Sequence, residues 1–121
     1  MPFVRIDIVK GKSREYKRTL LDCVHEGLVE AFGIDDDDRY QRICEIDGED
    51  FERPPEKTDG YTLIELTIFP GRTAAQKEHA IRSITSGISE SLGVSPKDIA
   101  IVMHEPPLEN WGFAGRQKKG Q

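Results

Sequence analysis

The stretch that decides the fold is VRIDIVKGKSREYKRTLLDCVHEGLVEAFG, residues 4–33, because a second stretch of the same design follows it. Residues 64–93 read IELTIFPGRTAAQKEHAIRSITSGISESLG and align with the first stretch without a gap, at a shift of 60 residues. Identical residues at this shift include Gly11 and Gly71, Lys17 and Lys77, Gly27 and Gly87, Glu30 and Glu90, Gly33 and Gly93, and Asp38 and Asp98. The simplest explanation is a duplicated structural unit.

Each half of the chain predicts a strand followed by a helix. Val4, Ile6 and Ile8 alternate with less apolar neighbours, which is typical of a strand with one buried face, and residues 64–68 repeat the pattern. The helices carry apolar residues at every third or fourth position, as one buried face requires. These residues are Leu20, Leu21, Val24, Leu28 and Phe32 in the first helix and Ile81, Ile84, Ile88 and Leu92 in the second. Ser13 and Thr73 are plausible N-caps, and Gly33 and Gly93 suit the helix ends.

A returning strand completes each half, at residues 39–46 and 99–104. After a crossover helix this strand lies parallel to the first, and right-handed crossovers place both helices on one face of the sheet. The expected fold is therefore α/β (α+β), with duplicated β-α-β units forming a four-stranded sheet. We expect a single domain over residues 1–121, with repeats at about 2–46 and 62–104, a polar linker at 47–60 and a docking tail at 105–121.

The sheet face opposite the helices is expected to be bare. Its side chains are too apolar for a wholly solvated surface and too polar for a sealed core, so we expect another subunit to cover it. These side chains are Phe3, Arg5, Asp7, Val9, Leu63, Glu65, Thr67 and Phe69.

Composition excludes several classes of protein. The 121 residues have a net charge of -5, with 32% charged and 36% hydrophobic residues, which is typical of a globular protein and does not favour nucleic-acid binding. No run of about 18 apolar residues and no signal-like segment is present, so no membrane association and a cytoplasmic location are expected. Cys23 and Cys44 lack metal or redox spacing and are expected to be buried thiols, and no metal site is expected.

Pro2, at the head of the first strand, has two interpretations. Proline lacks an amide hydrogen and is tolerated as the first residue of a strand, which explains it without any function. If Met1 is removed, however, Pro2 carries a free secondary amine, and α-amino groups titrate at about 7.7–8.0. Such an amine can accept or donate a proton near neutral pH.

Taken with the repeat, three motifs give the chain a resemblance to the tautomerase superfamily, whose members begin with a proline exposed by methionine removal. The motifs are DDRYQ at 37–41, PGRT at 70–73 and NWGF at 110–113. The segments DDRYQ and ENWGFAG, residues 109–115, look most like the malonate semialdehyde decarboxylase branch. The resemblance covers nearly the whole chain.

The resemblance implies a set of site residues. Pro2 would be the catalytic amine, Arg72 would bind the substrate carboxylate, and Asp38 would set the charge of Pro2 or position a water. Trp111 and Phe113 would line or cover the pocket, of this subunit or a neighbour, and Tyr40 would complete it, with Arg39 a further candidate. Each residue also has a plain structural reading: a solvated loop for Arg72 and Asp38, a strand start for Tyr40, and a tail anchor for Trp111 and Phe113. Some decarboxylases of the family carry a second arginine where this chain has Pro70, which leaves the substrate's size open.

The resemblance implies a cofactor-free enzyme, expected to be a homotrimer, that acts on a short oxo acid or unsaturated carboxylate. It favours decarboxylation of a 3-oxo acid such as malonate semialdehyde, with related hydratase activity, through cationic Pro2 or through a Schiff base formed by neutral Pro2. The first alternative is a keto–enol tautomerase in which neutral Pro2 is the general base. The second is a non-catalytic, ferredoxin-like ligand-binding module, in which Pro2 merely starts a strand.

Overall fold

Both halves of the chain form a strand, a helix and a second strand in the computed structural model. The structure describes residues 1–119. The first half contains β1 (Phe3–Val9), α1 (Arg14–Phe32) and β2 (Tyr40–Ile46), and the second contains β3 (Thr62–Thr67), α2 (Ala74–Leu92) and β4 (Ile99–His104). Short helical turns lie at η1 (Gly48–Asp50), η2 (Pro96–Asp98) and η3 (Leu108–Asn110), and the tail forms a small hairpin of β5 (Gly112–Phe113) and β6 (Arg116–Gln117).

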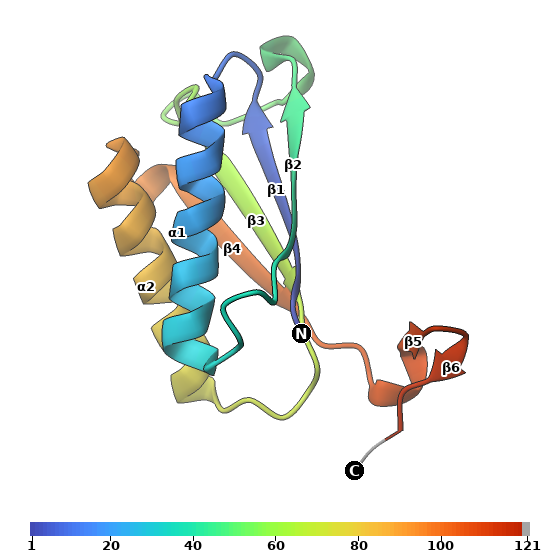
Figure 1. Ribbon diagram of the computed structural model, residues 1–121. Helices are drawn as coiled ribbons and strands as arrows, with labels where there is room; N and C mark the ends of the chain where they lie inside the picture. Colours follow the sequence, from blue (N-terminus) through green and yellow to red (C-terminus); the bar gives the residue numbers. More distant parts are fainter. Residues whose placement is uncertain (120–121) are drawn as a thin grey trace.

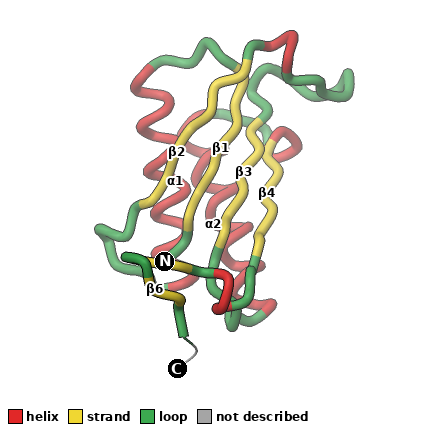
Figure 2. Tube along the Cα trace, turned by 90° about the vertical axis from the view of Figure 1, so that its right-hand side faces the viewer, coloured by secondary structure: helices red, strands yellow, loops and turns green. Residues whose placement is uncertain are grey.

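The four long strands form one sheet in the order β2-β1-β3-β4. β1 is parallel to β2 and β3 is parallel to β4, while β1 and β3 pair antiparallel at the centre. Figure 1 shows α1 and α2 side by side on one face of this sheet, and Figure 2 shows the sheet from its other face, with the helices behind. The predicted duplicated β-α-β fold is confirmed.

The helix ends follow the predicted capping residues. The Ser13 hydroxyl accepts a hydrogen bond from the Tyr16 amide at 3.0 Å, and the Thr73 hydroxyl accepts one from the Gln76 amide at 3.1 Å. The Gln76 side chain also accepts from the Thr73 amide at 2.9 Å, so α2 begins with a complete capping box. Both helices end at a left-handed glycine, with φ of 68° at Gly33 and 71° at Gly93.

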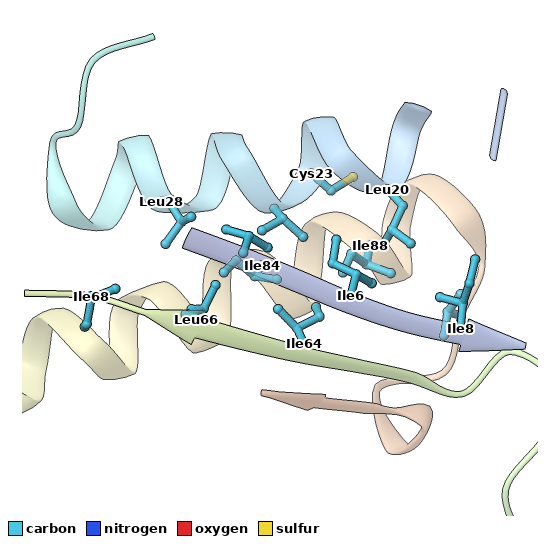
Figure 3. Close-up of a cluster of buried hydrophobic side chains, with 13 residues drawn as sticks. Ile6, Ile8, Leu20, Cys23, Leu28, Ile64, Leu66, Ile68, Ile84 and Ile88 are labelled. Carbon is cyan, nitrogen blue, oxygen red and sulfur yellow. The ribbon is translucent and has the colours of Figure 1, made fainter. Parts of the chain in front are cut away.

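The core lies between the sheet and the two helices, as Figure 3 shows. It is built from the inward side chains of β1 and β3 and from one stripe on each helix, and burying each large aliphatic side chain contributes about 1.5–3 kcal/mol. The largest fully buried residues are Ile6, Ile8, Leu20, Leu28, Ile64, Leu66, Ile68, Ile84 and Ile88.

The prediction that Ile81 faces the core is wrong, because its side chain is 42% exposed. The buried stripe of α2 runs through Ala80, Ile84 and Ile88, which are four residues apart. Ile81 follows Ala80 by one residue and is therefore turned away from the stripe by about 100°.

The two helices approach closely at a pair of glycines that the repeat relates to each other. A Cβ atom at Gly27 of α1 would lie 2.6 Å from Cγ1 of Ile84, which no packed side chain tolerates. A Cβ atom at Gly87 of α2 would lie 3.7 Å from Cβ of Cys23, an ordinary contact distance. Close packing therefore requires glycine at Gly27 but not at Gly87.

The face opposite the helices is only partly bare. Arg5 is exposed and Leu63 and Glu65 are half-buried, but Asp7 and Val9 are only 7% and 5% exposed, contrary to the prediction. Asp7 accepts a hydrogen bond from Arg5 at 3.1 Å, and Val9 lies against Gly48 at the start of the linker. The linker thus covers one end of this face, which periodicity within a strand does not show. Cys23 is buried as expected, whereas Cys44 is only half-buried.

Among residues 1–119, no helix combines the length and the apolar character needed to cross a membrane.

Candidate active site

The chain's amino end lies beside the loop that precedes β2. Pro2 is buried at the start of β1, and the Met1 amino nitrogen lies 3.8 Å from Oδ2 of Asp38. Figures 1 and 2 place this amino end and the tail at the same end of the sheet. The structure therefore places Asp38 beside Met1, the residue bonded to Pro2.

Asp38 is held in a turn that follows α1. Its amide donates to the Asp35 carbonyl at 3.1 Å, and its side chain is only 19% exposed. Within the described part of the chain, the buried Oδ1 atom of Asp38 has no hydrogen-bond partner. Because an unpaired buried acceptor costs about 1–3 kcal/mol, this oxygen favours a donor on a ligand or on the terminal amine.

Arg72 lies in the loop between β3 and α2, directly before the capping residue Thr73. Its guanidinium carbon lies 4.3 Å from the ring centroid of Phe32, the last residue of α1, so the cation stacks on an aromatic face. Burial lowers the pKa of Arg72, while the charges of Glu105 and Asp38 oppose this shift. An arginine keeps its charge in proteins, so Arg72 presents a fixed fork suited to a carboxylate.

The electrostatics of the amine reflect these neighbours. Burial is the largest cause and lowers the pKa of the Met1 amino group below its ordinary value. Asp38 raises the pKa, whereas the cations Arg72 and Lys118 lower it, and the net shift is downward. An amine at this position therefore becomes neutral at a lower pH than the same amine does in free solution.

Aromatic side chains form a wall beside the amino end. Phe3 lies in β1, Phe69 lies two residues after the end of β3, and Trp111 and Phe113 come from the tail. The ring centroids are 4.6 Å apart for Phe69 and Trp111, 6.1 Å for the stacked pair Trp111 and Phe113, and 5.7 Å for Phe3 and Trp111. Trp111 is 6% exposed, and its indole N–H donates to the Pro106 carbonyl at 3.0 Å. The tail is thus anchored on its own chain, next to Phe3.

Tyr40 is the first residue of β2, and Arg39 directly precedes it. The Tyr40 ring meets the Phe3 ring edge-on, with centroids 5.6 Å apart, and is 51% exposed. Arg39 donates from Nη2 to Oδ1 of Asp22 on α1 at 2.8 Å, so its charge is already paired within the chain. Tyr40 therefore borders the candidate site, whereas Arg39 is occupied elsewhere.

Sequence reasoning misses two contributors, Phe32 and Lys118. The sequence pattern places Phe32 on the buried helix face, yet it is the ring on which Arg72 stacks. The composition of the tail suggests a solvated basic end for Lys118, yet its ammonium nitrogen lies 5.2 Å from the ring centroid of Phe69. Both contacts join segments far apart in sequence, so no local pattern could have indicated them.

The chain belongs to the tautomerase family. A family model described as tautomerase enzyme matches residues 38–114, and a second model with the same description matches residues 2–56. Members of this family are enzymes, and this chain is one of them.

Two curated relatives illustrate the similarity. "Probable tautomerase YusQ" of Bacillus subtilis (strain 168) is 32% identical over 118 residues, which are 93% of each chain. The "2-hydroxymuconate tautomerase" of Comamonas testosteroni is 31% identical over 55 residues, which are 46% of this chain and 87% of that protein.

Among solved structures, FG41 malonate semialdehyde decarboxylase inhibited by 3-bromopropiolate is 28% identical, with a TM-score of 0.83 and coverage of 93% of this chain and 88% of that one. A fused 4-OT trimer structure is 22% identical with a TM-score of 0.86, covers 95% of this chain and 94% of that one, and supports the fold. The predicted family and fold are therefore confirmed, and these relatives carry names from more than one type of reaction.

Proposed function

We propose that this protein is a cofactor-free keto–enol tautomerase that moves a proton on a short oxo or unsaturated carboxylate. The amine would be that of Pro2, exposed by removal of Met1. The observation that supports this best is the meeting of the amino end, Asp38, Arg72 and the aromatic wall at one end of the sheet.

The surroundings of the amine favour its use as a general base. Pro2 is buried and adjoins the Met1 nitrogen, whose pKa is lowered first by burial and then by Arg72 and Lys118. The same neighbours would act on a Pro2 amine in the same direction. A lowered pKa increases the neutral fraction near pH 7, and only the neutral amine can accept a proton.

In this reaction Arg72 binds the substrate carboxylate through its guanidinium fork, and the aromatic wall excludes water from the carbon chain. The neutral amine takes the enol hydroxyl proton, which leaves an enolate and a protonated amine. As the C=O bond forms, the electron pair of the C=C bond takes that same proton from the amine at carbon, so the amine is regenerated and no co-reactant is needed. Asp38, whose Oδ2 lies 3.8 Å from the Met1 amino nitrogen, stabilises the cation between the two transfers.

The second candidate is decarboxylation of a 3-oxo acid such as malonate semialdehyde. The proximity of Asp38 supports it, because a carboxylate beside the amine favours the cationic form, and the 28% identity to a malonate semialdehyde decarboxylase supports it too. Here the bond between the carboxylate and the neighbouring carbon breaks, carbon dioxide leaves, and the electron pair forms an enolate that the cation stabilises. A pH–rate profile separates the candidates: a base loses activity as the amine is protonated, and an acid loses it as the amine is deprotonated.

For the assembly we propose a homotrimer that covers the partly bare sheet face. Val102 on this face is 45% exposed, and Arg5, Leu63 and Glu65 also reach the surface. Apolar surface of this kind is typical of a subunit contact. Light scattering on the purified protein measures the assembly directly, and a monomer at micromolar concentration contradicts the proposal.

The role of Pro2 is tested first by the intact mass of the active protein, which is expected to lack Met1. Pro2→Ala is expected to lower kcat/KM by about 10²–10⁴-fold, the range for loss of a positioned acid–base group. A matched control adds one residue that is not removed before Pro2, which keeps the proline ring but converts its amine to an amide. Unchanged thermal unfolding shows that both variants fold. Full activity in either variant contradicts the proposal.

A further inference from the structure

Lys118 is fixed in an unexpected place for a tail lysine. Its backbone amide donates to the Trp111 carbonyl at 2.8 Å, just beyond the β5–β6 hairpin. Its ammonium group lies over the Phe69 ring at 5.2 Å from the centroid, and Phe69 packs on Trp111. The backbone and the side chain of Lys118 are therefore both held against the aromatic wall of the proposed site.

Lys118 and Arg72 differ from other cations nearby in having no anionic partner. Lys77 pairs with Glu105 at 2.7 Å, and Lys17 pairs with Glu45. Over residues 1–119, by contrast, no carboxylate lies within ion-pair distance of Lys118 or Arg72. Both cations also lie near enough to the Met1 amino group for their charges to lower its pKa. Asp38 and Glu105 act on Arg72 from beyond ion-pair distance, so both cations remain available to an anionic ligand.

The surface beside Phe69 provides space for such a ligand. A hollow of about 680 Å³ is lined by Pro70 and by tail residues that include Lys118, Lys119 and Glu109. Pro70, two residues before Arg72, brings no charge to this side. Glu105 also lines the hollow, but its carboxylate is already held by Lys77. The positive charge on the lining of this hollow therefore comes from Lys118 and Lys119, of which Lys118 is held over the Phe69 ring.

Resting on the proposed function, we propose that Lys118 binds the substrate carboxylate together with Arg72, so that the tail contributes a specificity-determining cation. Arg72, stacked on Phe32, supplies the planar fork, and Lys118, held over Phe69, supplies a point charge. The pair makes the site selective for short carboxylates over neutral carbonyl compounds of the same shape.

The test compares Lys118→Gln with Arg116→Gln, which removes a positive charge from β6, outside the residues that line the hollow. With the enol of phenylpyruvate as the probe, Lys118→Gln is expected to raise KM roughly tenfold, the lower end of what a charge-assisted hydrogen bond contributes, with kcat nearly unchanged. Lys118→Arg should restore most of the affinity, and Arg116→Gln should behave as the parent protein. The methyl ester of the probe, which has no carboxylate charge, should show no change in any variant.

A binding measurement separates this proposal from the proposed function. Trp111 is the only tryptophan, so its fluorescence reports phenylpyruvate binding without turnover. Lys118→Gln is expected to raise the Kd about tenfold, again by the loss of a charge-assisted contact. An unchanged Kd, or an equal loss for the ester in the kinetic assay, overturns the role of Lys118. If Pro2→Ala keeps full activity while Lys118→Gln weakens binding, the proposed catalysis fails and the carboxylate site stands.

Discussion

The two halves of the molecule place the same residue types at equivalent positions and use them differently. Asp98, the counterpart of Asp38, is 4% exposed and accepts hydrogen bonds from the Thr58 amide at 3.2 Å and the Thr58 hydroxyl at 2.5 Å. Asp38 keeps a buried oxygen without a partner among residues 1–119. One aspartate is thus part of the framework, and the other is available for chemistry.

The cations of the two halves differ in the same way. Lys12, the counterpart of Arg72, donates to the Asp59 carbonyl at 2.9 Å. Arg72 instead stacks on Phe32, and no carboxylate among residues 1–119 forms an ion pair with its guanidinium. Thr58 and Asp59 both belong to the segment between β2 and β3. The linker therefore closes the second copy of the site, and a repeated motif alone does not identify a functional residue.

The largest expected difference between the halves is in the loss of kcat/KM when Arg72 or its counterpart Lys12 is replaced. Arg72→Ala is expected to lower kcat/KM by about 10²-fold, because a charge-assisted contact to a carboxylate contributes about 1.5–3 kcal/mol. Lys12→Ala removes only an exposed bond to a carbonyl and should leave kcat/KM unchanged. Steady-state kinetics on both variants measures this. Equal losses would mean that the two ends of the sheet are functionally alike.

Replacement of Asp98 should affect stability alone, whereas replacement of its counterpart Asp38 should affect activity alone. Asp98→Asn is expected to lower the free energy of unfolding by about 1–3 kcal/mol, because the Thr58 donors lose a buried charged acceptor, while kcat/KM stays unchanged. Urea unfolding measures this change.

Asp38→Asn should do the reverse, with little effect on unfolding and a change in the pH profile. Asp38 raises the pKa of the terminal amine, so its neutralisation lowers that pKa further. A general base is active above its pKa, and the acidic limb of kcat/KM should therefore move to lower pH. An unmoved limb, or one that moves to higher pH, contradicts the assignment of Asp38 beside the working amine.

The glycine pair of the helix contact should give effects of opposite sign. Gly27→Ala forces a Cβ to within 2.6 Å of Ile84 and is expected to destabilise the protein by about 1–3 kcal/mol. Gly87→Ala meets Cys23 at an ordinary 3.7 Å and should stabilise it by about 0.5–1 kcal/mol through helix propensity. Thermal unfolding of the two variants measures both, and a destabilised Gly87→Ala protein contradicts the spacing described at Cys23.

Much of the framework could be predicted because its signals are local. Period-two strands, the caps Ser13 and Thr73, and the glycines that end the helices each depend on a few neighbouring residues. Ile81 shows the limit of that reasoning, because a helix of mixed composition allows two phases for its apolar stripe, and packing at Ala80 selects one of them.

The candidate site was predictable only in part, because its partners come from different segments. Pro2, Asp38 and Arg72 could be proposed from the family resemblance, but the sequence does not show that Asp98 is satisfied by Thr58 while Asp38 is not. The stacking of Arg72 on Phe32 and the position of Lys118 over Phe69 likewise depend on how loop and tail fold back on the sheet.

The position of the tail has a consequence for how this protein can change over generations. Trp111 and Phe113 pack on Phe3 and Phe69, whereas the hydrophobic cluster lies between the sheet and the helices. If this aromatic wall is part of the proposed site, replacement of residues in the tail alters ligand preference while the cluster between sheet and helices is inherited intact.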